Sequence, residues 1–490
     1  MDYEAVIGLE THVQLKTQSK MWCGCANSFG APPNTHVCPV CLGLPGVLPV
    51  ANEEALRLTA LTGLLLHCTI PSTAKFDRKN YFYPDMPKNY QITQYDQPSA
   101  IGGYVEFEFG GGISRVRITR AHLEEDVGKS FHFERNSGVD FNRAGVPLME
   151  IVSEPDLSSA DMAYEYLNAL RDILVYGGVS DCDMEKGMVR CDVNVSVRPK
   201  GATELGAKIE IKNMNSFSGV RRALEYEIPR QIEVIRTGGK LVQSTRRWDD
   251  ATGVTEEMRS KEFAHDYRYF PDPDLMPFEP TEKWLEEVSS RAVELPLARK
   301  QRFMRDYGLP ATAAEVFKND VPLGDYFERI ASKSKNPKAV ANWVINNLRA
   351  KLAEHSVAGG PENPAQEVRT GSRALAALKF PPTALLELAG LVESKTISSS
   401  AAQQVFSEMF DTGKSPESIV REKGLAQVSD AGAIEKLCDE VIAANPGPAG
   451  DFKHGKTAAL NFLKGQVMKL SKGKANPALA GEILERKLKA

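Results

Sequence analysis

Residues 6–15 read Val6-Ile7-Gly8-Leu9-Glu10-Thr11-His12-Val13-Gln14-Leu15, so that apolar and polar side chains alternate. Successive side chains of a β-strand point to opposite faces. The stretch therefore predicts a strand that buries one face and carries Glu10, His12 and Gln14 on the other. Any half-buried antiparallel strand shows such alternation, so the pattern alone does not indicate a functional site. The presence of a carboxylate and an imidazole on the same face makes this strand a candidate for a functional site.

Two further stretches alternate in the same way. Residues 190–198 are expected to bury three valines and to present Asp192 and Asn194 together, and residues 208–212 form another short strand. Acidic and basic residues recur around these strands: Glu10, Glu124, Glu125, Asp126, Glu150 and Asp192 with His12, and Arg143, Arg190 and Lys212. Mg²⁺ prefers oxygen ligands, and Mg²⁺ with nearby Arg or Lys is typical of sites that handle ATP phosphates.

The character of the chain changes near residue 290. Short alternating segments broken by Gly, Pro and Asn precede it, and helical periods follow from about Pro296. We expect an α+β N-terminal domain with a largely antiparallel sheet, followed by all-α domains. Pro and Gly clusters at 359–361, 381–382 and 446–448 mark joints. The expected domains are residues 1–293, a helical connector over 294–405, and a small helical tail over 406–490.

Charge is unevenly distributed along the chain. The formal net charge of −4 over 490 residues excludes a polycation that coats nucleic acid. Residues 451–490 nevertheless carry nine Lys or Arg against three Asp or Glu. Leu460, Leu463, Val467 and Leu470 predict one apolar helix face there. The basic residues are either an RNA-docking patch or a solvated helix face, and both interpretations stay open. The candidates for RNA contact are Lys456, Lys464, Lys469, Lys472 and Lys474.

The sequence also bears on location. The longest apolar stretch, around Leu64–Leu66, is too short to span a bilayer. The first residues lack the basic start and apolar run of a secretion signal. We therefore expect a cytoplasmic protein without a membrane partner.

Four of the eight cysteines form two close pairs, Cys23 with Cys25 and Cys38 with Cys41. Two short pairs deliver the four soft ligands of tetrahedral zinc, and the Pro39 and Gly43 of the second pair favour a tight turn. The alternative is four free thiols. Four thiolates would fill the zinc shell, so the predicted zinc is structural and not catalytic.

Residues 450–457 match the Walker A pattern, but a P-loop requires a preceding strand. Ile434, Leu437, Cys438 and Val441 have helical spacing instead. We therefore predict a turn that opens the basic helix. No Ser nucleophile elbow or obvious Cys–His hydrolase signature occurs in the sequence, so we expect no hydrolase site of these kinds in this chain.

Several longer motifs resemble one known family. They are Ile7-Gly8-Leu9-Glu10-Thr11-His12-Val13-Gln14-Leu15, residues 140–155 (Asp140-Phe141-Asn142-Arg143-Ala144-Gly145-Val146-Pro147-Leu148-Met149-Glu150 and onward), Lys79-Asn80-Tyr81-Phe82-Tyr83-Pro84-Asp85, Lys88-Asn89-Tyr90-Gln91-Ile92, and residues 455–469. These motifs resemble the B subunit of the glutamyl- or aspartyl-tRNA amidotransferases. The likeness runs essentially from end to end.

The resemblance implies a cradle-like catalytic domain, a helical connector and a tail that contacts tRNA. It implies a heterotrimer with an amidase subunit, which releases ammonia from glutamine, and a small third subunit. Mischarged tRNA would be the substrate, and a non-discriminating aminoacyl-tRNA synthetase is a further possible partner. ATP, Mg²⁺ and a structural Zn²⁺ are the implied cofactors.

Residue roles carry over by position. The implied catalytic residues are Glu10, His12, Glu124, Glu125, Glu150 and Asp192, all except Glu124 at a Mg²⁺ site. Arg143, Arg190, Asn194 and Lys212 would contact the nucleotide, and Lys79 and Lys88 would line an ammonia passage. His12 is open between metal ligand, base and buried hydrogen-bonding group, because imidazole is a poor Mg²⁺ ligand.

The chemistry explains such a site. A carboxylate reacts with ammonia only after activation, and phosphorylation by ATP turns its oxygen into a leaving group. The alternative function is a zinc-containing tRNA-binding scaffold without catalysis. The acidic residues favour the enzyme, since carboxylates repel RNA phosphates unless a metal lies between them.

Overall fold

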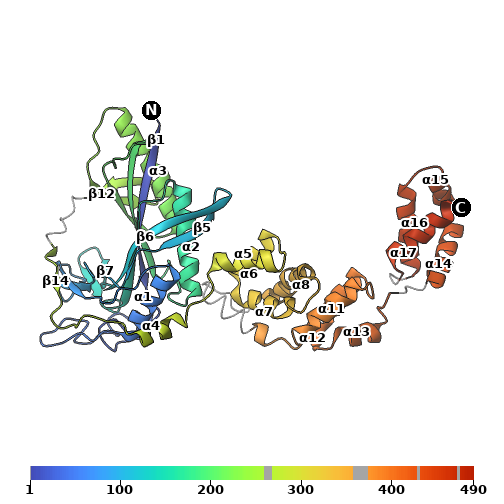
Figure 1. The fold of residues 1–490 in the computed structure, drawn as a ribbon, viewed down its shortest axis with the longest axis horizontal. Coiled ribbons are helices and arrows are strands. Elements are labelled where there is room, and N and C mark those ends of the chain that lie inside the picture. The colour runs from blue at the N-terminus through green and yellow to red at the C-terminus, as the bar shows by residue number, and fades with distance from the viewer. Residues whose placement is uncertain (1, 259–266, 357–373, 428–430, 472–474, 490) are drawn as a thin grey trace. The chain divides into compact units, whose positions relative to one another are not determined.

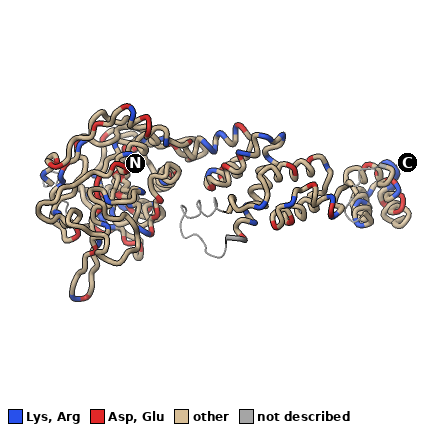
Figure 2. The backbone as a smooth tube through the Cα atoms, turned by 90° about the horizontal axis from the view of Figure 1, so that it is seen from below, with Lys and Arg blue, Asp and Glu red and all other residues tan. Residues whose placement is uncertain are grey.

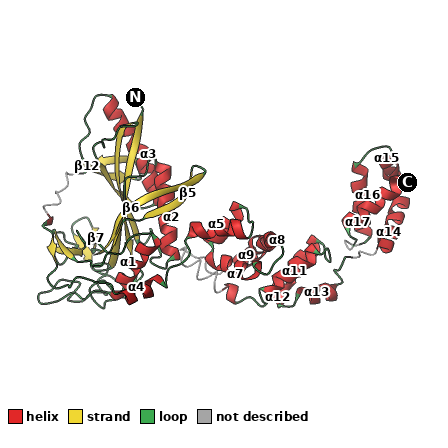
Figure 3. Ribbon diagram, in the orientation of Figure 1, coloured by secondary structure: helices red, strands yellow, loops and turns green. Residues whose placement is uncertain are grey.

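The computed structural model describes residues 2–258, 267–356, 374–427, 431–471 and 475–489. Lys472 and Lys474, two predicted RNA contacts, lie outside these ranges. The chain divides into two compact units, of which the first ends at Arg299 and the second begins at Lys300. The described strands belong to the first unit, and the described elements of the second are helices (Figure 3). The predicted α+β domain followed by all-α structure is confirmed.

The strands form one large sheet and smaller ones. They are β1 (Tyr3–Gln14), β2 (Asp77–Asn80), β3 (Tyr90–Thr93), β4 (Ala100–Ile101), β5 (Tyr104–Phe109), β6 (Gly112–Glu125), β7 (Lys129–His132), β8 (Ser137–Asp140), β9 (Pro147–Ser153), β10 (Val189–Pro199), β11 (Ile209–Met214), β12 (Ser244–Asp249), β13 (Val254–Glu257) and β14 (Phe270–Pro271). The large sheet has the order β13-β12-β11-β10-β1-β9-β6-β4, and β5 pairs with β6. Within it β11 and β12 are parallel, and the other described pairs are antiparallel, as predicted.

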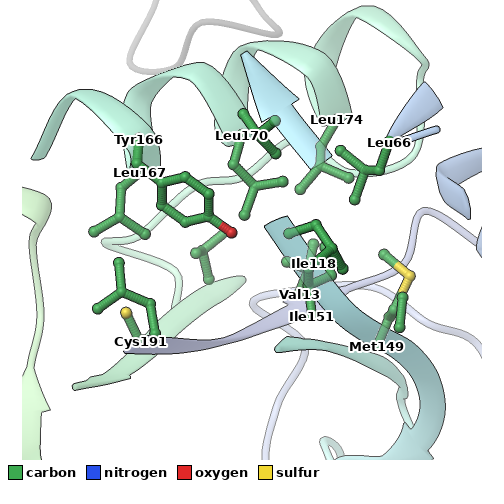
Figure 4. Packing of buried hydrophobic residues seen from close by; sticks show 14 of the residues in the cluster. Val13, Leu66, Ile118, Met149, Ile151, Tyr166, Leu167, Leu170, Leu174 and Cys191 are labelled. Atoms are coloured by element: carbon green, nitrogen blue, oxygen red, sulfur yellow. The ribbon is translucent and has the colours of Figure 1, made fainter. Parts of the chain in front are cut away.

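Helices cover one face of this sheet (Figure 1). The helices of the first unit are α1 (Glu53–Leu65), α2 (Ala160–Tyr176), α3 (Phe217–Arg236) and α4 (Glu282–Ser289), and α5 (Pro296–Asp306) spans the boundary. Helix α2 begins where the Ser159 hydroxyl accepts a hydrogen bond from the Met162 amide. Its Leu167, Leu170 and Leu174 are at most 1% exposed. They pack against apolar side chains of the sheet (Figure 4), and full burial of one such side chain stabilises the fold by about 1.5–3 kcal/mol.

The packing of β1 defines the two faces of the sheet. Ile7, Leu9 and Val13 are at most 1% exposed and belong to the first hydrophobic core. Glu10 and His12 alternate with them and therefore point to the opposite face, which we call the open face. The predicted alternation of residues 6–15 is confirmed.

The second unit is built from helices around two separate cores. Its helices after α5 are α6 (Ala311–Asn319), α7 (Val321–Ala331), α8 (Pro337–Trp343), the π-helix η2 (Val344–Leu348), α9 (Arg349–Ser356), α11 (Thr383–Glu393), α12 (Ser399–Thr412), α13 (Pro416–Lys423), α14 (Ala431–Ala444), α15 (Pro446–Lys453), α16 (Ala458–Leu470) and α17 (Pro477–Lys489). Buried residues of one core run from Phe303 to Val420, and those of the other from Ile434 to Leu488.

The expected boundary after residue 405 falls within α12. Val405, Phe406 and Met409 of this helix all belong to the Phe303–Val420 core. The helix continues to Thr412 and ends at Gly413, whose φ of 78° is the left-handed conformation that glycine adopts readily. We therefore place the division after α13.

The tail helix α16 follows its predicted apolar face for most of its length. Leu463 and Val467 are fully buried and Leu460 packs partly against them. Leu470 is 48% exposed, so the prediction is wrong at this residue, which is the last of the helix.

The segment over residues 450–457 is not preceded by a strand. Helix α14 (ending at Ala444) confirms the helix predicted from the spacing of Ile434 to Val441, and because α15 extends to Lys453 the predicted turn before α16 is confined to residues 454–457. Within the described residues, no helix has the length and apolar character needed to cross a membrane.

Candidate functional site

Four adjacent strands place polar side chains in one row across the open face. His12 of β1 lies opposite Arg190 of β10 on one side and Glu150 of β9 on the other. Glu150 in turn lies opposite His122 of β6. Directly opposed residues of antiparallel strands share a face, so segments more than 100 residues apart meet here.

One group in this row, which we call the histidine cluster, consists of His12, Glu124 and Glu150. One potential ligand atom from each lies within 4.8 Å of the other two. His12 Nδ1 is 2.9 Å from Glu124 Oε1, and His122 Nε2 is 3.3 Å from Glu150 Oε2. Glu124 Oε2 also accepts a hydrogen bond of 3.1 Å from Gln91. Glu124 is therefore held by His12 and Gln91, and Glu150 is held by His122.

Electrostatic interactions within the histidine cluster shift the pKa values of His12 and Glu150. Burial lowers the pKa of His12, but the hydrogen bond and charge of Glu124, with the charges of Glu150 and Asp192, raise it to about 9. Burial raises the pKa of Glu150. The hydrogen bond and charge of His122 and the charges of His12 and Lys79 outweigh this effect and hold the pKa of Glu150 well below its usual range. In the metal-free chain at neutral pH, His12 is therefore protonated and Glu150 ionised.

A second group, which we call the lysine cluster, consists of Glu10, Asp192, Glu210 and Lys212. Glu10 lies opposite Asp192, and one oxygen from each carboxylate lies within 4.8 Å of the others. Lys212 forms an ion pair with Asp192, and its Nζ is 3.1 Å from Glu210 Oε1. Burial lowers the pKa of Lys212, but the two carboxylates outweigh this effect and hold it above its usual range. Asn194 donates a hydrogen bond of 2.8 Å to Glu10.

Glu125 belongs to neither cluster, in contrast to the expected metal site. It follows Glu124 directly in β6, and consecutive residues of a strand point to opposite faces. Its carboxylate forms an ion pair with Lys88 and accepts a hydrogen bond of 2.9 Å from the Ile92 amide. Both side chains of the pair are less than 10% exposed, so Lys88 is held in a buried contact.

The two expected nucleotide-binding arginines converge on Asp126, which is buried. Arg190 Nη2 lies 2.8 Å from one Asp126 oxygen, and Arg143 Nε lies 3.6 Å from the other. Arg143 also donates hydrogen bonds to the carbonyls of Val127 and Gly128. Arg143 is thus tied to the backbone, whereas the Arg190 side chain is 40% exposed beside His12.

Lys79 lies against the rings of Tyr81 and Tyr267. Its Nζ is 4.8 Å from the Tyr267 ring centroid and 5.9 Å from that of Tyr81. Its charge contributes to the lowered pKa of Glu150. Of the two lysines expected at an ammonia passage, Lys79 is therefore the one that neighbours a carboxylate of the histidine cluster.

The four clustered cysteines form a third group. The four Sγ atoms all lie within 4.8 Å of one another, and Cys38 Sγ is 3.9 Å from Cys41 Sγ. Zn–S bonds of about 2.3 Å in a tetrahedron separate sulfurs by roughly 3.8 Å, so the donor set fits zinc. A hydrogen bond from Cys23, the Cys38 amide and the Lys20 charge lower the pKa of Cys41 to about 4, although burial opposes this. A thiolate is the form that binds metal.

The described tail lysines differ in their surroundings. Lys456 is exposed and lies 3.0 Å from Asp451, and Lys469 is exposed in the last turn of α16. Lys464 lies against Gly481 of α17, where an added Cβ would come within 2.3 Å of its Cε. Two of the three are thus open to solvent.

Three residues that belong to the clusters or contact them were missing from the expected site: Gln91, His122 and Glu210. His122 precedes Glu124 by two residues in β6 and therefore lies on the same face. The two-residue period of the strand could have indicated His122 as a neighbour of Glu124. Glu210 lies in the short alternating stretch recognised at 208–212. Gln91 reaches Glu124 from β3, a contact that no local pattern indicates.

Comparison with known proteins bears on this arrangement. Residues 5–286 match the family model described as the GatB/GatE catalytic domain, and residues 325–488 match the GatB domain. The chain is 52% identical over 490 residues to the B subunit of the aspartyl/glutamyl-tRNA(Asn/Gln) amidotransferase of Caldanaerobacter subterraneus subsp. tengcongensis, covering all of both chains. It is 52% identical over 501 residues to the protein of the same name from Methylacidiphilum infernorum, covering all of this chain and 99% of the relative.

Proposed function

The chain belongs to the family of aspartyl/glutamyl-tRNA amidotransferase B subunits, and from this premise we propose that its open face phosphorylates a misacylated carboxylate and then amidates it. The substrate would be glutamate on tRNA(Gln), aspartate on tRNA(Asn), or both. The observation that carries the proposal is the convergence of His12, Glu124 and Glu150 from three strands on one point.

The donor set fits a divalent cation. Mg²⁺ takes ligands at 2.0–2.1 Å in an octahedron, which places neighbouring ligand atoms roughly 3 Å apart and opposite ones about 4.2 Å apart. The separations within the histidine cluster need only small side-chain shifts to match. We assign the cation to Glu124 and Glu150, with His12 either as a third ligand after losing its proton or as a hydrogen-bonding partner.

Bound Mg²⁺ would offset the charge of the transferring phosphoryl group and so lower the barrier. The substrate carboxylate oxygen attacks the γ-phosphorus of ATP, the bond to the β,γ-bridging oxygen breaks, and ADP leaves. Ammonia then attacks the acyl carbon, phosphate leaves with the carbonyl-bound oxygen, and a proton is lost. Lys79 and the exposed Arg190 supply positive charge beside the cluster.

The remaining parts of the proposal follow from the family. The amidase subunit would supply ammonia, the small third subunit would complete a heterotrimer, and the exposed Lys456 and Lys469 would contact the body of tRNA. The four cysteines would hold a structural zinc. Because mischarged tRNA is made in the cytoplasm, the enzyme would act there.

Production of ADP by the assembled complex with mischarged tRNA tests the phosphorylation step. We expect Glu150→Gln to lower it about 100-fold or more, because a metal ligand of this kind is worth several kcal/mol. The matched control is Glu256→Gln, which removes an exposed glutamate of β13 paired with Arg247 and should leave the rate unchanged. Equal rates for both variants and wild type would instead favour a non-catalytic tRNA-binding scaffold.

A further inference from the structure

Five tyrosines form a continuous chain of ring contacts near the histidine cluster, and we name this chain the tyrosine ladder. Its order is Tyr83, Tyr81, Tyr267, Tyr269, Tyr95. Successive ring centroids are 6.1, 6.3, 6.1 and 4.2 Å apart. The first three contacts are edge-to-face, and Tyr269 stacks on Tyr95 with an interplanar angle of 11°.

The ladder is held by contacts outside its own rings. Strand β14 pairs with β2 next to Tyr269, and Arg78 Nε binds the buried Asp272 at 2.8 Å. Asn80 donates hydrogen bonds of 3.2 and 2.9 Å to the carbonyls of Tyr267 and Arg268. The rings are therefore positioned before any ligand arrives, which lowers the entropic cost of binding.

The ladder borders the histidine cluster. Tyr95 lies two residues after β3, whose Gln91 donates a hydrogen bond of 3.1 Å to Glu124 Oε2, and burial together with nearby charges that include Glu124 and Glu150 raises the pKa of Tyr269. At the Tyr95 end, Arg120 Nη1 lies 3.2 Å from the Tyr95 carbonyl oxygen. Arg120 precedes His122 by two residues in β6 and shares its face of the sheet.

Both ends of the ladder are open. Tyr95 is 47% exposed although one of its faces lies on Tyr269, and Tyr83 is 66% exposed. Lys79 lies under the middle of the ladder, and Arg268 is exposed beside it. Aromatic faces with interleaved cations are the standard surface for unpaired nucleotides, whose bases stack while the cations offset phosphate charge.

We propose that the tyrosine ladder binds the unpaired 3′ end of the tRNA and so delivers the aminoacyl carboxylate to the histidine cluster. This inference rests on the proposed function, because the amino acid is esterified to the terminal ribose and the last bases must lie near the reacting group. The length of the ladder favours several consecutive bases over the single adenine of ATP.

Binding of uncharged tRNA to the assembled complex, without ATP, tests the ladder separately from catalysis. The tRNA is used intact and lacking its last three nucleotides. Loss of one base–aromatic stack weakens binding about 5- to 150-fold, so Tyr95→Ala should show a loss within this range for intact tRNA. The truncated tRNA should bind wild type and variant equally. Tyr95→Phe keeps the ring and should bind intact tRNA as wild type does.

Three outcomes would overturn the proposal. The first is that Tyr95→Ala weakens the binding of intact and truncated tRNA equally, and the second is that it does not weaken the binding of intact tRNA. The third is that Tyr95→Ala weakens ATP binding and leaves tRNA binding unchanged, which would assign the ladder to the adenine of ATP. Thermal unfolding of each variant checks the fold. Should Tyr95→Ala unfold, Tyr83→Ala at the more exposed end gives the same comparison. A failure of ADP production with intact tRNA binding would count against the proposed function and not against the ladder.

Discussion

The histidine cluster and the lysine cluster begin two residues apart on β1, at His12 and Glu10, yet they are neutralised differently. In the lysine cluster, Lys212 bridges Asp192 and Glu210, and its pKa lies above the usual range. In the histidine cluster, the positive charge is a proton on His12 that leaves at a pH of about 9.

The difference teaches which carboxylates are free to exchange partners. A lysine that keeps its proton is a permanent counter-ion, so a metal in the lysine cluster would have to displace Lys212 from Asp192 and Glu210. An imidazole can release its proton and leave two carboxylates for a cation. We therefore expect the histidine cluster to bind the metal. The lysine cluster would instead link neighbouring strands and border the bound substrate.

The largest expected effect concerns Glu125, a third carboxylate with a permanent counter-ion. Lys88→Met would leave Glu125 buried without its cation, which costs about 3–5 kcal/mol of folding stability. Chemical denaturation of the full chain measures this change in the free energy of unfolding. The double variant Lys88→Met/Glu125→Gln should recover part of the loss. A loss below about 1 kcal/mol would show that Lys88 is not a fixed counter-ion.

Lys212→Met tests the lysine cluster in the same way. The ion pairs are partly exposed, so solvent screening reduces the expected destabilisation to about 2 kcal/mol. Lys208→Met, which removes a lysine from the same segment, serves as the control. Were Lys212→Met as stable as wild type and also able to bind a second divalent cation, the contrast between the clusters would disappear.

His122 sharpens the comparison as a positioning residue, because it contacts Glu150 and belongs to neither cluster. His122→Phe removes the hydrogen-bond donor and should weaken Mn²⁺ binding about 10- to 100-fold. His122→Gln retains an N–H donor and should restore most of the affinity. Equal affinities for the two variants would show that His122 only fills space.

The last effect is a pH dependence, which amounts to about tenfold for each pH unit. Because the pKa of His12 is raised from 6.5 to about 9, its contribution to folding stability is complete below pH 6.5 and is lost as the pH rises toward 9. A cation that displaces this proton should bind about tenfold more tightly per pH unit between 7 and 9. His12→Gln should abolish the slope. A slope that persists in this variant would assign the proton to another group.

Sequence periodicity predicted individual strands well. The alternation of β1 and β10 was visible because one face of each packs on the core, which repeats every second residue. The adjacency of Glu124 and Glu125 in one strand already implied opposite faces, although the expected catalytic set contained both residues and the expected Mg²⁺ site contained Glu125 without Glu124.

Other features depend on contacts that no local pattern encodes. Which strands pair, and that His12 lies opposite Glu150, is decided by packing between segments 138 positions apart. Residues 399–412 contain no Pro or Gly, so the local sequence does not mark where the tail begins. The rings of the tyrosine ladder come from three segments, and its order follows only from the pairing of β2, β3 and β14.

Titration of the zinc-loaded full chain with Mn²⁺ tests the central claim most directly. Two matched substitutions on the same face, Glu150→Gln and Glu210→Gln, remove one carboxylate from each cluster. We predict one bound cation per chain, lost in Glu150→Gln and kept in Glu210→Gln. Retention in Glu150→Gln together with loss in Glu210→Gln would contradict the account and assign the metal to the lysine cluster.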